Sequence, residues 1–228
     1  MQGLLLVDKP TDWTSFDVVN YVRRIVATTE GKKPKNCKVG HTGTLDPFAT
    51  GLLVLLVGKE YTRRASELSK LDKTYEVTLE LGKTSSTGDP EGEISVVSDT
   101  IPTREALEQA LEPFRGPIMQ TPPAYSAIKI DGQRAYKLAR EGKEVKIEPR
   151  PVTINRLELI EYTYPTVKLV ADVSSGTYIR TLVEDIGTLL QTGAYTIELR
   201  RTSVGDYQIN NATKVQELGD NLPLIEMS

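Results

Sequence analysis

The sequence has few of the residues that crosslinks and most metal sites need. Its 228 residues include one cysteine, Cys37, and one histidine, His41. A single cysteine excludes an intramolecular disulfide, which is typical of proteins from a reducing cytoplasm. A structural zinc site needs about four cysteine or histidine ligands, and no DxD-like carboxylate grouping stands out for magnesium. We therefore expect no metal site, and any chemistry must come from Asp, Glu, Tyr, Lys and Arg.

Long apolar stretches are also missing. The longest uninterrupted apolar run covers residues 52–57, whereas a helix that crosses a bilayer needs about 20 apolar residues. The N-terminal residues 1–8 have no basic stretch and too short an apolar segment for a signal peptide. The sequence thus predicts no membrane contact and a cytoplasmic location.

Charge is nearly balanced overall, at a formal −3, but it is unevenly distributed. Residues 31–73 carry nine Lys or Arg against four Asp or Glu, and residues 129–150 carry seven against four. Residues 84–114 hold seven acids and one base, and residues 181–228 hold seven acids and three bases. One basic face on an acidic body suits the binding of a particular RNA, although solvated faces without a partner are the more common explanation of such blocks.

Hydrophobic periodicity predicts strands and helices in mixed order. Strands are expected over 4–7, 52–57, 75–81, 124–130, 145–147, 152–160, 167–173 and from 197. Helices are expected from an N-cap at Ser15, from an N-cap at Thr103, over 134–141 and around 179–190. We expect a basic loop over 28–38. The lack of strict β-α-β alternation disfavours a Rossmann-like sheet and favours an α+β domain with a large antiparallel or mixed sheet. No repeat or linker is visible, so a single domain is expected over 1–228.

The most informative stretch is the glycine-rich segment 40–51, which reads GHTGTLDPFATG. It presents one carboxylate, Asp46, and Pro47 stiffens the chain directly after it. The three glycines allow close approach of a bulky ligand to the backbone. An isolated Asp-Pro more often forms a turn or caps a helix, so the segment alone leaves both interpretations open.

This segment resembles the GHTGxLDPxATG loop of the TruB family of pseudouridine synthases, and further family motifs follow in the family's order. Residues 8–15 are similar to its KPxGxTS motif, with Asp12 and Trp13 as departures, and Lys73-Thr74-Tyr75 resembles its KxY motif. Its TxTxD-type turn is resembled by residues 85–89, and its RNA-gripping insertion (about 120–150) by residues 122–142. Its CSxGTYIR motif is resembled by residues 174–180, and its LRRTxVG strand by residues 199–205. The resemblance implies a pseudouridine synthase fold, with a central mixed or antiparallel sheet flanked by helices and RNA-binding loops.

The resemblance also implies a function: isomerisation of uridine to pseudouridine in tRNA, most often at position 55 of the T-arm loop, without a cofactor. Asp46 would be the catalytic carboxylate, Arg180 its ion partner, and Tyr75 the ring that stacks on the flipped uracil. His41 would fill the gap left by the flipped base, and Tyr178 and Leu199 would line the pocket. From the pattern alone, a helix-surface arginine is the more common interpretation of Arg180 and a core residue that of Leu199, and Tyr75 and Tyr178 could also be core residues.

Five basic residues are expected to contact RNA phosphates, which would make binding salt-dependent. They are Lys9, Lys129, Arg134, Lys137 and Arg140. Lys9 has an alternative role, because it could buttress the loop of Asp46.

Two alternatives remain open at this point. RNA-guided relatives share the aspartate loop, but they rely on a C-terminal PUA-type domain and on guide-RNA partners. The sequence ends about 23 residues after the LRRTxVG segment, so we expect no PUA-type domain. We also expect a monomer that requires no protein partner. A non-catalytic RNA-binding module is the other alternative, although such a module has no use for a buried ion pair that costs desolvation.

Overall fold

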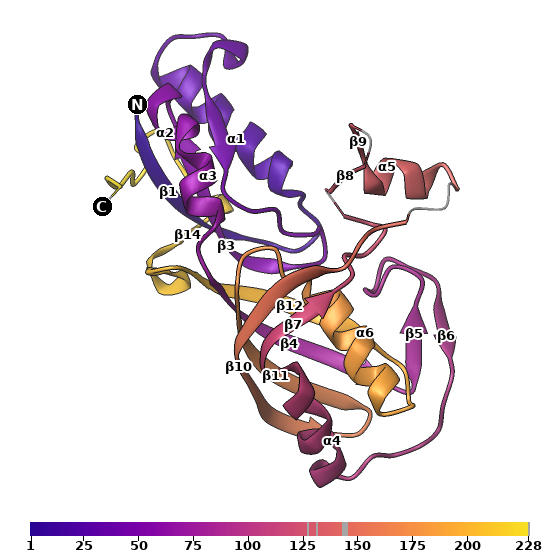
Figure 1. Ribbon diagram of the computed structural model, residues 1–228. Coiled ribbons are helices and arrows are strands. Elements are labelled where there is room, and N and C mark those ends of the chain that lie inside the picture. The colour runs from indigo at the N-terminus through magenta and orange to yellow at the C-terminus, as the bar shows by residue number, and fades with distance from the viewer. Residues whose placement is uncertain (127, 131, 143–145, 228) are drawn as a thin grey trace. The chain divides into compact units, whose positions relative to one another are not determined.

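The computed structural model describes residues 1–126, 128–130, 132–142 and 146–227 (Figure 1). The backbone forms two compact units. The first unit comprises Met1–Glu76 and Leu199–Ser228, and the second comprises Val77–Glu198. Strands β4 (Lys73–Leu81) and β12 (Ala194–Val204) each run from one unit into the other.

The first unit is built on strands that follow the order β14-β1-β3-β12. Antiparallel pairing joins β1 to β3, and parallel pairing joins β3 to β12. Its remaining elements are β1 (Gly3–Lys9), α1 (Ser15–Thr29), η1 (Pro34–Asn36), β2 (Val39–His41), β3 (Thr50–Val57), α2 (Lys59–Arg63), α3 (Ala65–Ser69), β13 (Tyr207–Gln208), η3 (Ile209–Asn211), β14 (Thr213–Lys214) and η4 (Val215–Glu217).

The core of the first unit explains its sequence. Residues 4–7 and 51–57 are buried along their whole length, because β1 and β3 are covered on both faces. Strands covered on both faces read as continuous apolar runs rather than as alternating patterns. The two runs predicted as buried strands are therefore confirmed.

Helix α1 begins one residue earlier than its predicted cap implies. The N-cap is Thr14, whose Oγ1 accepts from the Asp17 N–H at 3.1 Å, while the Asp17 carboxylate accepts from the Thr14 N–H at 2.9 Å. This reciprocal pair is a capping box. The predicted N-cap, Ser15, is wrong because its hydroxyl bonds elsewhere, as described below.

The second unit follows the strand order β12-β4-β11-β10-β7. Antiparallel pairing joins β10 to both β11 and β7, and helices α4 and α6 lie side by side (Figure 1). Its remaining elements are β5 (Lys83–Ser85), β6 (Ile94–Val96), α4 (Arg104–Leu111), η2 (Glu112–Phe114), β7 (Gly116–Gln120), β8 (Lys129–Ile130), β9 (Gln133–Arg134), α5 (Ala135–Arg140), β10 (Arg150–Thr163), β11 (Thr166–Val173) and α6 (Ile179–Leu189). The expected α+β architecture with a mixed sheet is confirmed.

Three predictions about the chain path are wrong. The expected strand over 124–130 is reduced to β8, because Pro122 and Pro123 lack N–H groups for a ladder and the Tyr125 carbonyl accepts from Arg180 instead. Lys146 and Ile147 form no strand, and Val145 lies outside the described residues. The expected loop over 28–38 contains the end of α1 and the short helix η1.

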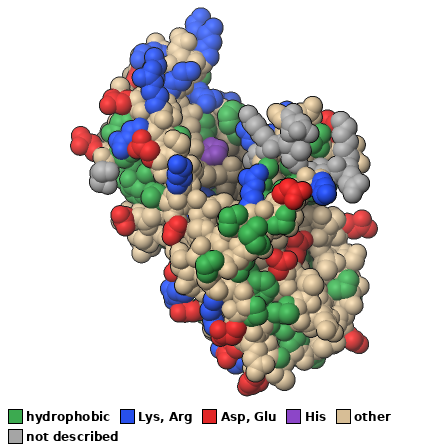
Figure 2. All heavy atoms as spheres, viewed as in Figure 1, with side chains coloured by type: hydrophobic (Ala, Val, Ile, Leu, Met, Phe, Trp, Pro, Cys, Tyr) green, Lys and Arg blue, Asp and Glu red, His purple; other side chains and the backbone are tan. Residues whose placement is uncertain are grey.

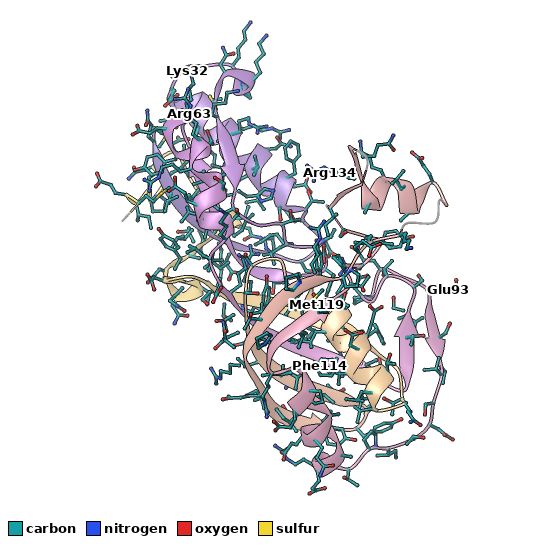
Figure 3. All side chains as sticks on the ribbon, in the orientation of Figure 1. Lys32, Arg63, Glu93, Phe114, Met119 and Arg134 are labelled. Carbon is teal, nitrogen blue, oxygen red and sulfur yellow. The ribbon has the colours of Figure 1, made fainter. Side chains whose placement is uncertain are left out.

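Strand β7 was missed by the sequence analysis. It is a terminal strand of the sheet order, and it contains Pro117 and the 63% exposed Met119, which Figure 3 labels. Proline is well tolerated on such edge strands because its missing N–H breaks no ladder bond there, and it obscures the alternating pattern. Among the described helices, none has both the length and the apolar composition needed to cross a bilayer.

Candidate active site

Asp46 lies in the first unit, in the loop between β2 and β3, and its residue is half-buried. The loop starts where the Thr42 N–H donates to the Val54 carbonyl at 3.1 Å, and it turns where the Ala49 N–H donates to the Asp46 carbonyl at 3.1 Å. For the loop to hold a carboxylate in one place, the rest of its backbone must also be fixed.

Lys9, at the end of β1, fixes the loop just after Asp46. Its ammonium is fully buried and donates to the carbonyls of Pro10 at 2.8 Å, Trp13 at 2.6 Å and Pro47 at 3.2 Å. The Asp12 N–H donates to the Pro47 carbonyl as well, at 2.9 Å. This burial does not suit the expected phosphate contact of Lys9, and the geometry favours the alternative that Lys9 buttresses the loop.

The two departures from the family's N-terminal motif have structural counterparts. Asp12 adopts a left-handed backbone with a φ of 64°, a conformation that Asp tolerates better than most residues other than glycine. Trp13 packs its ring edge-on against Tyr21 of α1, with centroids 5.9 Å apart. Both residues thus support the segment that Lys9 joins to the loop.

Helix α1 fixes the loop just before Asp46. The hydroxyl of Ser15 accepts from the Leu45 N–H at 2.8 Å and lies 3.0 Å from the Leu45 carbonyl oxygen, to which it donates. Both Ser15 and Leu45 are buried, so these bonds are shielded from competing water.

Two buried cations flank the start of the loop, and sequence reasoning gave a role to neither. Arg201 of β12 donates from Nη2 to the Gly43 carbonyl at 3.1 Å and from Nε to the Leu52 carbonyl at 2.8 Å. A side chain on Gly43 would meet Arg201 Nη1 at 3.4 Å and Lys73 Cε at 3.8 Å. Both cations belong to quoted motifs, LRRT and KxY, which is the signal that could have found them.

Lys73 is a buried ammonium with perturbed chemistry. Nζ donates to the carbonyls of Ser69, at 2.9 Å, and Leu71. Burial, with a further contribution from the nearby Arg201 guanidinium, lowers the pKa of Lys73 to about 8. The side of the loop at Gly43 therefore faces two buried basic side chains, those of Lys73 and Arg201.

Arg180 lies in the second unit, in the first turn of α6, and is 5% exposed. Its Nη1 donates to the Thr87 carbonyl at 2.7 Å and lies 3.2 Å from Asp89 Oδ2, and its Nη2 donates to the Tyr125 carbonyl at 2.9 Å. The guanidinium is therefore held in one orientation. It is not a helix-surface arginine.

The turn around Asp89 is built to hold this arginine. Asp89 is 3% exposed, and its Oδ1 accepts from the Thr87 hydroxyl at 2.5 Å and from the Glu91 N–H at 3.1 Å. Gly88 lies between Thr87 and Asp89 with a φ of 73°, and a Cβ there would come within 2.9 Å of a Glu184 carboxylate oxygen. Glu184 is itself a perturbed group, because burial raises its pKa. The TxTxD-type turn, quoted from the sequence without a role, thus positions Arg180.

Tyr178 is the N-cap of α6, but its side chain makes no capping bond. Gln120, at the end of β7 and 2% exposed, binds its backbone instead. The Gln120 amide donates to the Tyr178 carbonyl at 3.1 Å and accepts from the Tyr178 N–H at 2.8 Å. No motif marks Gln120, so sequence reasoning could not have found it.

The remaining site residues fall into three groups. His41, half-buried at the end of β2, and the buried Tyr75 and Leu199 belong to the first unit with Lys9 and Asp46. Arg134 and Lys137 are exposed on β9 and α5 of the second unit, and Arg134 is labelled in Figure 3. The side chains of Lys129 and Arg140 lie outside the described part of the structure.

Comparison with known proteins decides the family. A model described as the TruB family pseudouridylate synthase N-terminal domain matches residues 29–179, and one described as the tRNA pseudouridylate synthase B C-terminal domain matches residues 180–226. The chain belongs to the TruB family of pseudouridine synthases. The quoted motifs therefore identified the family correctly.

Individual TruB relatives cover almost the whole chain. A tRNA pseudouridine synthase B from Pseudomonas syringae pv. syringae (strain B728a) is 47% identical over 218 residues, which are 96% of this chain and 68% of the relative. One from Parabacteroides distasonis is 43% identical, over 96% of this chain and 92% of the relative. A crystal structure of a Cbf5-Nop10-Gar1 complex matches with a TM-score of 0.71 and 27% identity, over 95% of this chain. The match covers 53% of the length of the corresponding chain in that complex.

Proposed function

We propose that this chain converts uridine 55 of the tRNA T-arm loop to pseudouridine and that Asp46 performs the chemistry. Its membership of the TruB family makes it a pseudouridine synthase, an isomerase that acts on tRNA. The observation that carries the role of Asp46 is the fixation of its loop on both sides. Ser15 bonds Leu45, and Lys9 and Asp12 bond Pro47.

The reaction needs one ionised carboxylate. The bond between N1 and C1′ breaks, the uracil turns, and a bond between C5 and C1′ forms, while the C5 proton leaves and N1 gains one. A carboxylate can start this rearrangement as a nucleophile or by removing a sugar proton. The departing uracil carries negative charge on its own oxygens, so no second carboxylic acid is required and no cofactor takes part.

We assign the other roles by the family motifs. Arg180 pairs with Asp46 and keeps it ionised, and its fixed guanidinium, held by Thr87, Asp89 and Tyr125, supports this role. Tyr75 stacks on the flipped uracil, and Tyr178 and Leu199 line the pocket. His41 fills the gap left in the RNA stack, since extruding a base costs a few kcal/mol.

The insertion over about 120–150 binds the RNA backbone. The exposed cations Arg134 and Lys137 support this assignment, and Lys129 and Arg140 are assigned with them from the sequence. We further propose that the chain acts as a cytoplasmic monomer, as one catalytic domain over 1–228, without a protein partner.

Two other functions remain as alternatives to be tested. A catalytic subunit of an RNA-guided enzyme is less well supported, because the identity is 43–47% to proteins named tRNA pseudouridine synthase B and 27% to a chain of the Cbf5-Nop10-Gar1 complex. A non-catalytic RNA-binding module does not explain why Arg180 is buried beside Asp89 at the cost of desolvation.

The deciding experiment uses a tRNA transcript tritiated at uridine C5 and the purified protein without added metal. Near-stoichiometric tritium release is expected from wild type. Asp46→Asn should lower the rate by at least roughly a hundredfold while tRNA still binds.

Asp220→Asn is the matched control, because it makes the same change at an exposed residue of the same unit and should release tritium at the wild-type rate. Near-normal activity of Asp46→Asn would show that the assignment of Asp46 is wrong. Binding without tritium release by wild type would favour the binding module or a guide-dependent enzyme.

A further inference from the structure

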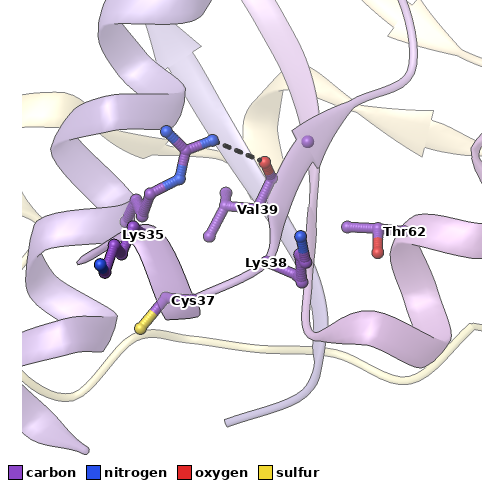
Figure 4. Close-up of a pocket in the computed structure, with 7 residues that line it drawn as sticks. Lys35, Cys37, Lys38, Val39 and Thr62 are labelled. Carbon is purple, nitrogen blue, oxygen red and sulfur yellow. Dashed lines mark hydrogen bonds between the residues drawn. The ribbon is translucent and has the colours of Figure 1, made fainter. Parts of the chain in front are cut away.

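A basic pocket of about 350 Å³ lies in the first unit and has no part in the proposed chemistry (Figure 4). Side chains from α1, η1, β2 and α2 line it, and its three cations are Arg23, Lys35 and Lys38. Figure 2 shows Lys and Arg side chains gathered over the upper end of this unit, where Figure 3 labels Lys32 and Arg63. Apart from Arg23, the lining residues of the pocket belong to the basic segment 31–73 that the sequence singled out.

The positive charge of the pocket is not neutralised. Arg23 donates from Nη1 to the Asn20 side-chain oxygen at 2.7 Å. It also donates from Nη2 to the Val39 carbonyl at 3.2 Å (Figure 4). Both acceptors are uncharged, so they fix the guanidinium and leave its charge. Lys35 and Lys38 are exposed, and neither forms an ion pair with any described residue. The pocket therefore suits an anionic group.

An exposed aromatic side chain lies next to the pocket on the same helix. Phe16 is 58% exposed, and the Arg23 guanidinium carbon lies 5.7 Å from its ring centroid. Phe16, Asn20 and Arg23 follow i, i+4, i+7 spacing, so they share one face of α1. We call these three residues the α1 stripe.

The α1 stripe connects the pocket to the proposed active site. Phe16 directly follows Ser15, which bonds the residue before Asp46. Seven residues of helix separate Phe16 from Arg23, a distance of about 10 Å along the axis. The stripe therefore leads from the end of α1 at the catalytic loop to the pocket, over a length comparable to that of a few nucleotides.

We propose that this pocket binds a backbone phosphate of the substrate RNA and that Phe16 stacks on a base or ribose beside it. Exposed aromatic rings next to fixed guanidinium groups are suited to stacking on nucleotides, and Arg and Lys are the usual partners of phosphate oxygens. The inference rests on the proposed function, in that the chain acts on RNA. It adds an anchor in the first unit, outside the insertion over 120–150.

The test measures the Kd of an unmodified tRNA transcript by filter binding at several salt concentrations. Lys35→Ala/Lys38→Ala should raise the Kd roughly tenfold near physiological salt and make the plot of log K against log salt shallower by about 1, the change for one lost phosphate contact. Phe16→Ala should raise the Kd by a smaller factor without changing this slope, because it removes stacking and no charge.

The matched control is Lys70→Ala/Lys214→Ala, which removes two exposed lysines of the same unit that do not line the pocket. It should change the Kd less than twofold. If the pocket variant binds tRNA as the control does, the proposal is wrong. A titration of wild type and the pocket variant with inorganic phosphate tests whether the pocket binds free phosphate instead of RNA. If the pocket variant loses phosphate binding but keeps its tRNA affinity, the pocket is a small-anion site and the proposal is wrong.

Failure of the proposed function would appear in a different measurement. Wild type that binds tRNA but releases no tritium from C5-tritiated uridine would disprove the isomerase activity, while the Kd comparison would still decide the pocket. Unchanged far-ultraviolet circular dichroism verifies that the variants fold.

Discussion

The two units hold their key charged groups by opposite means. In the first unit, the buried cations Lys9 and Arg201 donate to carbonyls of the loop that carries the carboxylate of Asp46. In the second unit, the buried carboxylate of Asp89 and two carbonyls hold the guanidinium of Arg180. For Asp46, buried cations fix the backbone of the loop that carries the carboxylate. For Arg180, a buried carboxylate and two carbonyls fix the side chain itself.

This difference has a physical reason. A loop has many backbone carbonyls but few ways to become rigid, so long cationic side chains that reach several carbonyls restrict it effectively. An arginine on a helix already has a fixed backbone, and only its long side chain needs orientation. A fork of donors met by a carboxylate and carbonyls provides that orientation.

The largest effect is expected in the second unit, from Asp89→Asn. The substitution removes a carboxylate from beside a buried guanidinium, so the free energy of unfolding should fall by about 3–5 kcal/mol. Urea unfolding measures it. Glu91→Gln, a change of charge two residues away on the exposed side of the turn, should cost less than 1 kcal/mol. Equal effects of the two variants would break the comparison, because Asp89 would then not be specifically placed.

The next effect is expected in the first unit, from Lys9→Met. Methionine fills most of the space but leaves the carbonyls of Pro10, Trp13 and Pro47 without this donor. Unfolding free energy should fall by about 3 kcal/mol, and kcat should fall because Pro47 is no longer fixed. Lys9→Arg, which keeps the charge, should recover part of both. Recovery of stability without any recovery of kcat would show that Lys9 supports the fold and not the loop.

A pH-dependent effect is expected from Lys73. Its folded-state pKa of about 8 lies below the unfolded value of about 10.4, so the unfolded chain binds more protons between these values. Stability should therefore increase with pH across this range, by about 2 kcal/mol from pH 8 to pH 10 relative to Lys73→Met. Urea unfolding of both proteins at each pH isolates this contribution. Parallel curves would mean that Lys73 titrates normally and that the loop lacks this perturbed cation.

The smallest effect concerns the helix starts of the two units. Thr14→Ala removes the capping box of α1 and should lower the free energy of unfolding by about 1 kcal/mol. Thr103→Ala removes the N-cap bond of α4 in the second unit and should cost a similar amount. Tritium release separates them: only Thr14→Ala should also slow the reaction, since α1 carries Ser15. Equal rates would argue against α1 as a support of the loop.

Much of the fold was predictable because its signals are local. The apolar runs of β1 and β3, the alternation of β4 and β11, and the cap of α4 at Thr103 each depend on a few neighbouring residues. The strand predicted over 124–130 failed because a distant arginine takes the Tyr125 carbonyl, which no local pattern shows. Strand β7 was missed because proline and an exposed methionine hide an edge strand.

The sequence by itself determined the family, the fold class and the candidate residues, since the motifs around Asp46, Tyr75 and Arg180 are contiguous and keep the family's order. The tertiary structure decided what holds those residues. Lys9 is a buried donor to the loop, Arg201 supports Gly43 from a distance of 158 residues along the chain, and Gln120 binds the backbone of Tyr178. Such contacts join segments far apart in the chain, and a buried polar group finds its partner only when the whole chain is packed.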